Sequence, residues 1–150
     1  MIERGSKVPG AAVAVDTNVL GAGLVPGRPD LWAAARRSLD DVGLLISFVT
    51  AAELRFGARR AGWGRVRLSA LEGRLTSVII VWPGPRLLAR YVDLRDGLAR
   101  SGHGLADKIH EADRWIAATA LDLGVPLVTN DRIFLDVPAL DVHLVTSAGA

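Results

Sequence analysis

Cysteine is absent from this 150-residue sequence, which excludes disulfide bonds and thiolate metal sites and fits a reducing compartment. Long apolar runs are also missing, because no stretch approaches the ~20 residues that a membrane-spanning helix needs. The first ten residues lack the hydrophobic core of a secretory signal. We therefore expect a cytoplasmic protein, with a flexible lead-in at residues 1–10 and one domain over residues 11–150.

Lysine is nearly absent too, since all but two of the 18 basic residues are arginine. The arginines gather between residues 55 and 74, where Glu72 is the only acid. Their planar guanidinium groups can donate two hydrogen bonds to one phosphate, so this cluster is a candidate nucleic-acid contact, and a solvated helix face is the alternative. Its members are Arg55, Arg59, Arg60, Arg65, Arg67 and Arg74, of which we expect the first five to contact the nucleic acid.

Short apolar segments alternate with longer helical patterns, which is typical of an α/β fold. The sequence predicts strands at residues 11–15, 43–48, 77–81, 126–129 and 142–145. It predicts helices at residues 29–39, 50–60, 65–75 and 85–100, and a last long helix that ends near residue 123. The strand segments are continuously apolar rather than alternating, which indicates a parallel sheet covered on both faces.

Polar residues follow the predicted strands at the edge where open α/β sheets bind ligands, outside the carboxyl ends of their strands. Asp16 follows the first strand, Glu53 lies soon after the second, and Asp131 follows the fourth. Asp113 stands near the start of the last long helix, whose N-terminal end reaches this edge if the helix runs antiparallel to the next strand. We therefore expect four carboxylates to face one cleft.

Each acid also has a purely structural explanation. Asp16 and Asp131 suit turns or helix caps, and Glu53 ends a T-x-x-E capping box. Asp113 would complement the dipole at a helix N-terminus. If its helix begins near Asp107, Asp113 lies instead on the apolar stripe and needs a partner, for which the sequence identifies no certain histidine or lysine.

Clustered carboxylates repel one another, because two charges ~5 Å apart at an effective dielectric of ~20 cost about 3 kcal/mol. Shared protons or a bound cation relieve this repulsion. All-oxygen ligands suit hard divalent ions, so the acids predict Mg²⁺ or Mn²⁺, and the lack of cysteine argues against zinc. Such an ion can align a phosphate and stabilise developing charge, which fits the hydrolysis of phosphodiester bonds.

Four segments, VDTNVL, TAAELRFGA, ADRWIAATA and LVTND, follow one another between residues 15 and 131. Together they resemble the PIN-domain family, and most closely the VapC-type toxins of bacterial toxin–antitoxin pairs. The resemblance implies a three-layer α/β/α sandwich with a mostly parallel central sheet of four to five strands. It also implies a Mg²⁺-dependent ribonuclease acting on single-stranded RNA, with Mn²⁺ as an alternative ion, a homodimer and a cognate antitoxin.

The resemblance implies roles for individual residues as well. The matched motifs place an acidic quartet that holds the metal at Asp16, Glu53, Asp113 and Asp131. Thr17 and Asn18 complete the first motif. Thr129 matches a position that often carries a hydroxyl or amide beside the last acid. Residues 11–150 would then form a single PIN-like nuclease domain.

Other functions fit less well. A phosphatase with an aspartate nucleophile at a strand end needs a second acid two residues on, where this chain has Asn18. A receiver-type signalling domain needs a lysine after a late strand, and neither Lys7 nor Lys108 stands there. Two alternatives stay open: a non-catalytic or regulatory nucleic-acid-binding PIN module, and a PIN nuclease that processes RNA outside a toxin–antitoxin pair.

Large apolar side chains lie where surface helices would expose them. They are Leu31 and Trp32 in one helix and Phe56 and Trp63 around the next. Burial in the core is the alternative, above all for Trp32 and Phe56. If these side chains are exposed, they suit an amphipathic helix of the antitoxin. We then expect a basic or polar residue of the antitoxin tail to reach toward the acidic quartet.

Overall fold

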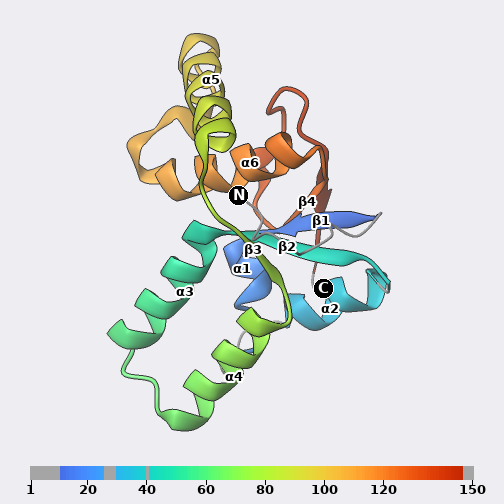
Figure 1. Ribbon diagram of the computed structural model, residues 1–150, viewed down its shortest axis with the longest axis vertical. Coiled ribbons are helices and arrows are strands. Elements are labelled where there is room, and N and C mark those ends of the chain that lie inside the picture. Colours follow the sequence, from blue (N-terminus) through green and yellow to red (C-terminus); the bar gives the residue numbers. More distant parts are fainter. Residues whose placement is uncertain (1–10, 26–29, 40, 147–150) are drawn as a thin grey trace.

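A computed structural model describes residues 11–25, 30–39 and 41–146, so the expected lead-in at residues 1–10 lies outside the described residues. Five strands form one parallel sheet in the order β3-β2-β1-β4-β5 (Figure 1). The strands are β1 (Ala12–Val15), β2 (Gly43–Ser47), β3 (Ile79–Val81), β4 (Leu127–Thr129) and β5 (Val142–Leu144). All five lie within the segments expected from the sequence.

The helices also follow the expected pattern, with an added short helix after β1. They are α1 (Thr17–Leu20), α2 (Leu31–Ser38), α3 (Phe48–Arg60), α4 (Arg65–Thr76), α5 (Pro85–Ser101) and α6 (Glu111–Leu123). Single 3₁₀ turns occupy Gly104–Ala106, Lys108–His110 and Arg132–Phe134. Gly102 and Gly124 directly follow α5 and α6 and cap them, with φ angles of 67° and 63° in the left-handed region that glycine adopts without strain.

Two helix starts differ from the expectation. α3 begins at Phe48 rather than at Thr50, because the Ser47 hydroxyl accepts a hydrogen bond from the Val49 N–H and caps the helix two residues earlier. α6 begins at Glu111 rather than near Asp107, because 3₁₀ turns occupy the preceding segment. Both shifts change how the nearby acids are interpreted.

The sheet is covered on both faces, which confirms the three-layer α/β/α sandwich (Figure 1). Val13, Val15 and Ile46 point to one face and form a core with α1, α2, α3 and α4. Ala14 and Leu127 point to the other face and form a core with α5 and α6. This arrangement explains the continuously apolar strands, because alternate side chains enter two different cores.

α3 and α4 form a hairpin that extends away from the sheet (Figure 1). Arg74 of α4 fastens the base of the hairpin, since its Nη1 donates to the carbonyl of Leu20 at 2.9 Å and to the carbonyl of Ala22. Arg74 is therefore a structural residue rather than a free surface cation. Among the described residues, no helix combines the length and apolar character that crossing a bilayer requires.

Candidate active site

Asp16 is buried where β1 ends and caps α1. The residue is only 3% exposed. One oxygen, Oδ1, accepts a hydrogen bond from the Thr17 N–H at 2.7 Å, and the other, Oδ2, accepts one from the Thr129 hydroxyl at 2.6 Å. The capping explanation is therefore correct for Asp16, and it leaves the carboxylate at the sheet edge where ligands bind.

Thr129 links the first and last acids of the quartet. β1 and β4 are neighbours, so Thr129 stands beside Asp16 although 113 residues separate them. While its hydroxyl donates to Asp16, its oxygen accepts from the Asp131 N–H at 3.0 Å. Asp131 in turn caps the turn at Arg132–Phe134, because its Oδ1 accepts from the Ile133 N–H at 2.9 Å. Thr129 thus holds both acids at one edge of the sheet.

Glu53 joins the site through Thr17. The Thr17 hydroxyl donates to Glu53 Oε1 at 2.9 Å and lies 3.0 Å from the Thr50 hydroxyl. The capping box expected from Thr50 and Glu53 is wrong, because Ser47 caps α3 and both residues lie inside the helix. Glu53 is instead oriented by the residue that follows Asp16. Asn18 lies exposed in α1 and takes part in none of these hydrogen bonds.

Asp113 lies in the first turn of α6, half-buried, where its charge also favours the positive end of the helix dipole. Its Oδ2 is 2.8 Å from Nδ1 of His110. The sequence did not identify this partner, although a spacing of three residues would bring the two side chains together at a helix start. Placing Asp113 on a longer stripe is wrong as well, since Ile109 belongs to a 3₁₀ turn and is 84% exposed.

The four carboxylates lie close enough to influence one another. Burial raises the pKa of Asp16 to about 6, against the hydrogen bond from Thr129, and the charges of Asp113 and Asp131 raise it further. Glu53 is an exposed residue, yet partial burial of its carboxyl group raises the pKa of that group. The charge of Asp113 adds to this effect. The electrostatic coupling therefore runs from Glu53 through Asp113 to Asp16 and Asp131.

The donor chemistry of this cluster fits a hard divalent cation, since every carboxylate oxygen is a suitable ligand. As the side chains stand, no three His, Asp or Glu residues of the described chain are arranged to hold one ion. One oxygen each of Glu53, Asp113 and Asp131 is engaged by a protein hydrogen-bond partner. No buried side-chain oxygen in the described residues lacks a partner, so the second oxygens are open to solvent or to an ion.

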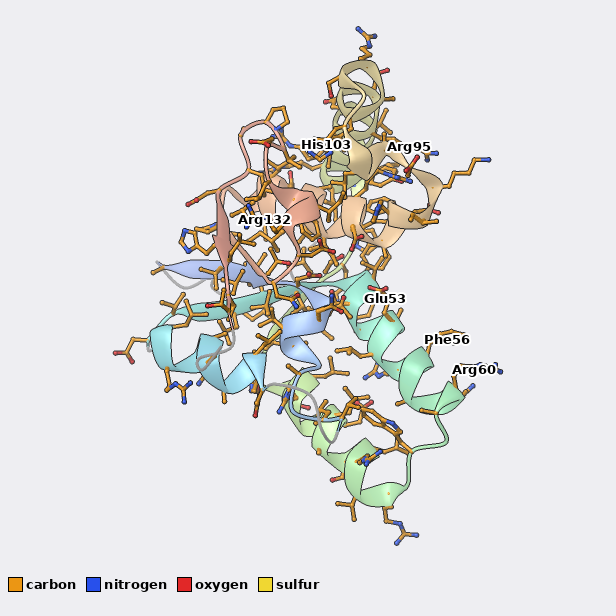
Figure 2. The ribbon with its side chains drawn as sticks, turned by 180° about the vertical axis from the view of Figure 1, so that it is seen from behind. Glu53, Phe56, Arg60, Arg95, His103 and Arg132 are labelled. Carbon is orange, nitrogen blue, oxygen red and sulfur yellow. The ribbon has the colours of Figure 1, made fainter. Side chains whose placement is uncertain are left out.

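The arginine cluster lies along the α3–α4 hairpin. Arg55 forms two 2.9 Å hydrogen bonds with Glu72, and Arg67 stacks 5.7 Å above the Trp63 ring. Arg59, Arg60 and Arg65 are exposed near the tip. Figure 2 shows Glu53 at the inner end of α3, with Phe56 and Arg60 farther out on the same helix.

The apolar side chains expected at a partner surface differ in exposure. Phe56 is 66% exposed, which excludes a core position for it. Trp32 and Trp63 are half-buried against the core of the α1–α4 face, and Leu31 is half-buried too. Trp32 is also covered by the guanidinium groups of Arg36 and Arg74, at 5.7 and 5.2 Å. Trp32 is therefore mainly a packing residue.

Comparisons with known proteins concern the family and the fold of the chain. The model of the PIN domain family matches residues 13–140. No curated protein sequence matches the chain significantly. Among solved structures, a chain of VapBC2 from Rickettsia felis, bound to a DNA fragment from its promoter, superposes with a TM-score of 0.76 at 21% identity, covering 90% of this chain and 99% of that chain.

Two further structures share more sequence with this protein. VapBC-1 from nontypeable Haemophilus influenzae has a TM-score of 0.69 and 27% identity, covering 89% of this chain and 97% of that one. VapBC-5 from Mycobacterium tuberculosis, a member of the VapBC family of toxin–antitoxin systems, has a TM-score of 0.66 and 27% identity, covering 90% and 99%. The resemblance seen in the sequence motifs is confirmed, and the chain belongs to the PIN-domain family.

Proposed function

We propose that this protein is a metal-dependent endoribonuclease and the toxin of a toxin–antitoxin pair. The observation that carries the proposal is the meeting of four carboxylates, from four separate elements, at the carboxyl edge of a parallel sheet in a PIN domain. The structurally similar VapBC-1 and VapBC-5 chains support the toxin–antitoxin part, because both belong to VapBC systems.

The residues of the site would divide the work as follows. Asp16 and Asp113 would hold Mg²⁺, or Mn²⁺ in its place, and Glu53 and Asp131 would complete the set of oxygen donors. When bound, such an ion supplies Lewis-acid stabilisation of the charge that develops on the scissile phosphate. Thr129 fixes the positions of Asp16 and Asp131 relative to each other through its hydroxyl, and Thr17 orients Glu53.

The proposal is tested by incubating the purified protein with single-stranded RNA in Mg²⁺. We expect oligonucleotides with 5′-phosphate ends, and no cleavage once a chelator removes the metal. Binding of the RNA without cleavage under any divalent ion would favour the alternative of a non-catalytic PIN module. Sequencing the RNA ends that form after brief induction in the host would then identify the target class.

Glu53→Gln is expected to lower cleavage by at least about 10-fold while leaving the thermal stability unchanged. The amide keeps an oxygen that can accept from Thr17 but removes the charge that would attract a cation. Because Ser47 rather than Thr50 and Glu53 caps α3, no cap is lost. Parallel activity assays and thermal denaturation check this, and a large fall in stability with full activity would refute it.

The exposed arginines near the hairpin tip are expected to contact the RNA backbone. Glu53 and Arg60 are seven residues apart on α3, which places them about 10 Å apart along the helix. Changing Arg59, Arg60 and Arg65 together to alanine should weaken RNA binding and make its dependence on salt about 2 units less steep on a log–log scale. The matched control changes Arg86, Arg90 and Arg100 of α5 to alanine. If the salt dependence of RNA binding is unchanged in the hairpin variant, these arginines form only a solvated helix face.

A groove between α3 and α4 is our proposed docking site for an apolar segment of the antitoxin. It encloses about 400 Å³ and is lined by Arg55, Ala58, Arg59, Gly62, Trp63, Leu68, Leu71 and Glu72. Phe56 and Val66 do not line the groove but stand exposed on the same hairpin, at 66% and 84%. Apolar side chains around a groove suit the apolar face of an amphipathic helix.

Phe56→Ala is expected to weaken antitoxin binding by about 10-fold or more without lowering stability, because Phe56 buries little surface in the isolated protein. Trp32→Ala should instead lower stability and leave the affinity of the folded fraction unchanged. Co-purification of the antitoxin and circular dichroism distinguish the two effects. Equal antitoxin binding by Phe56→Ala and Trp63→Ala variants and the parent would place the docking site elsewhere.

A further inference from the structure

His110 stands at the start of α6 and directs its ring at Asp113 rather than at the helix backbone. Its Nδ1 lies 2.8 Å from Asp113 Oδ2, and its side chain makes no cap hydrogen bond to α6. An ionised carboxylate only accepts hydrogen bonds, so Nδ1 carries the hydrogen and donates it. The bond fixes one oxygen of Asp113 and leaves the other for a further partner.

The segment that carries His110 is held in place by buried contacts. The His110 N–H donates to the carbonyl of Asp107 at 3.0 Å, and the same carbonyl accepts from Arg114 Nη1 at 2.7 Å. Arg114, 1% exposed, also donates to the carbonyl of Leu105 at 2.9 Å. The position of His110 is therefore set by the fold and is not that of a free surface side chain.

Asp113 is electrostatically coupled to two other members of the quartet. Its charge reaches both Asp16 and Glu53, whereas Asp131 acts on Asp16. His110 and Asp113 are both partly accessible, with side-chain exposures of 22% and 27%. Their contact is therefore partly accessible to solvent.

We infer that His110 is a positioning residue of the acidic quartet, which orients the Asp113 carboxylate through its Nδ1–H and does not itself bind the ion. The inference rests on the proposed metal-dependent function. Hydrogen-bond donors that orient metal ligands typically contribute about 10- to 100-fold to metal affinity. His110 would do this for Asp113 as Thr129 does for Asp16 and Thr17 for Glu53.

The test is titration of the full-length protein with Mn²⁺ alone, followed by calorimetry, with thermal denaturation in parallel. His110→Ala is expected to bind Mn²⁺ about 10- to 100-fold more weakly than the parent. His110→Asn should recover most of the affinity, because its amide can donate near the position of Nδ1 but has nothing at the position of Nε2. His143→Ala is the matched control, since His143 pairs with Asp141 at 3.3 Å on the exposed edge strand β5.

The outcomes separate this inference from the proposed function. If the parent and His110→Ala bind Mn²⁺ equally, the positioning role is wrong while the metal site stands. If His110→Asn binds as weakly as His110→Ala although both are folded, a donor near the position of Nδ1 is not what supports binding, and the inference fails. If the parent binds no Mn²⁺ at all, the proposed metal-dependent function fails, and this inference fails with it.

Discussion

Replacing Asp16 by asparagine is expected to abolish metal-dependent cleavage and, at pH 7 without metal, to make the protein more stable. Activity should fall by more than about 100-fold, because loss of a metal ligand exceeds the 10- to 100-fold cost of losing a residue that only orients one. Stability should rise because the carboxylate is buried beside Asp113 and Asp131, whose charges repel it. Asparagine keeps a hydrogen-bond acceptor for the Thr17 N–H.

The sign of the pH dependence follows from the raised pKa of Asp16. Between its ordinary value of 3.8 and about 6, the folded protein holds this proton more tightly than the unfolded chain. Ionisation of Asp16 therefore lowers stability as the pH rises through this window, by up to about 3 kcal/mol above pH 6. Below the unfolded value both states are protonated, and the penalty disappears.

Thermal denaturation of the metal-free parent and Asp16→Asn at pH 4 and pH 7 checks this expectation. The two proteins should differ little at pH 4, whereas at pH 7 the variant should melt higher, by up to roughly 6–12 °C. Asp93→Asn, at an exposed position on α5, is the control and should leave the difference small at both pH values. A variant that is less stable at pH 7 would mean that its hydrogen bonds to Thr17 and Thr129 outweigh the burial of charge.

Arg114→Met is expected to lower the stability of the protein by about 1–3 kcal/mol. The guanidinium is fully buried and forms no ion pair with a carboxylate of the described residues, but it donates to the carbonyls of Leu105 and Asp107. The Asp107 carbonyl keeps the His110 N–H as a donor, whereas the buried carbonyl of Leu105 loses its donor, which costs about 1–3 kcal/mol. Methionine retains much of the side-chain volume, so the loss reports on the donors rather than on a cavity.

Urea denaturation and amide hydrogen exchange measure this effect. Amide exchange should become faster over residues 104–110, the segment whose carbonyls accept hydrogen bonds from Arg114. It should change less in the rest of the protein. Arg90→Met on the exposed face of α5 is the matched control and should change stability by less than about 0.5 kcal/mol. Equal stability of Arg114→Met and the parent would show that burying the charge costs as much as its hydrogen bonds return.

The sequence predicted the strands and the placement of the acids because both depend on strong local patterns. Continuously apolar segments identify the strands, and the edge where acids meet follows from a parallel topology. The starts of α3 and α6 were harder to predict from the sequence, because they depend on a serine cap and on 3₁₀ turns. Correcting the start of α3 also removes the structural explanation for Glu53, which increases the weight of the functional one.

The contacts that orient the acids are long-range or depend on buried geometry. Thr17 reaches Glu53 across 36 residues and Thr129 reaches Asp16 across 113, so no local pattern reveals either pair. Arg114 is followed by an apolar stretch of α6, and its carbonyl partners lie in the preceding segment, so they cannot be identified before that segment is folded. The ion pair between Arg55 and Glu72 of the facing helix is also a long-range contact. It separates Arg55 from the other arginines of the cluster.

Crystals grown with Mn²⁺, measured at a wavelength where manganese scatters anomalously, test the central claim most directly. That claim is that the acidic quartet forms one metal site. We expect an anomalous peak at coordination distance, roughly 2–2.5 Å, from carboxylate oxygens of both Asp16 and Asp113. The same peak should vanish in crystals of Asp16→Asn. A peak that lies elsewhere on the protein, or an absent peak in crystals of a protein that cleaves RNA in Mn²⁺, would contradict the assignment of the site.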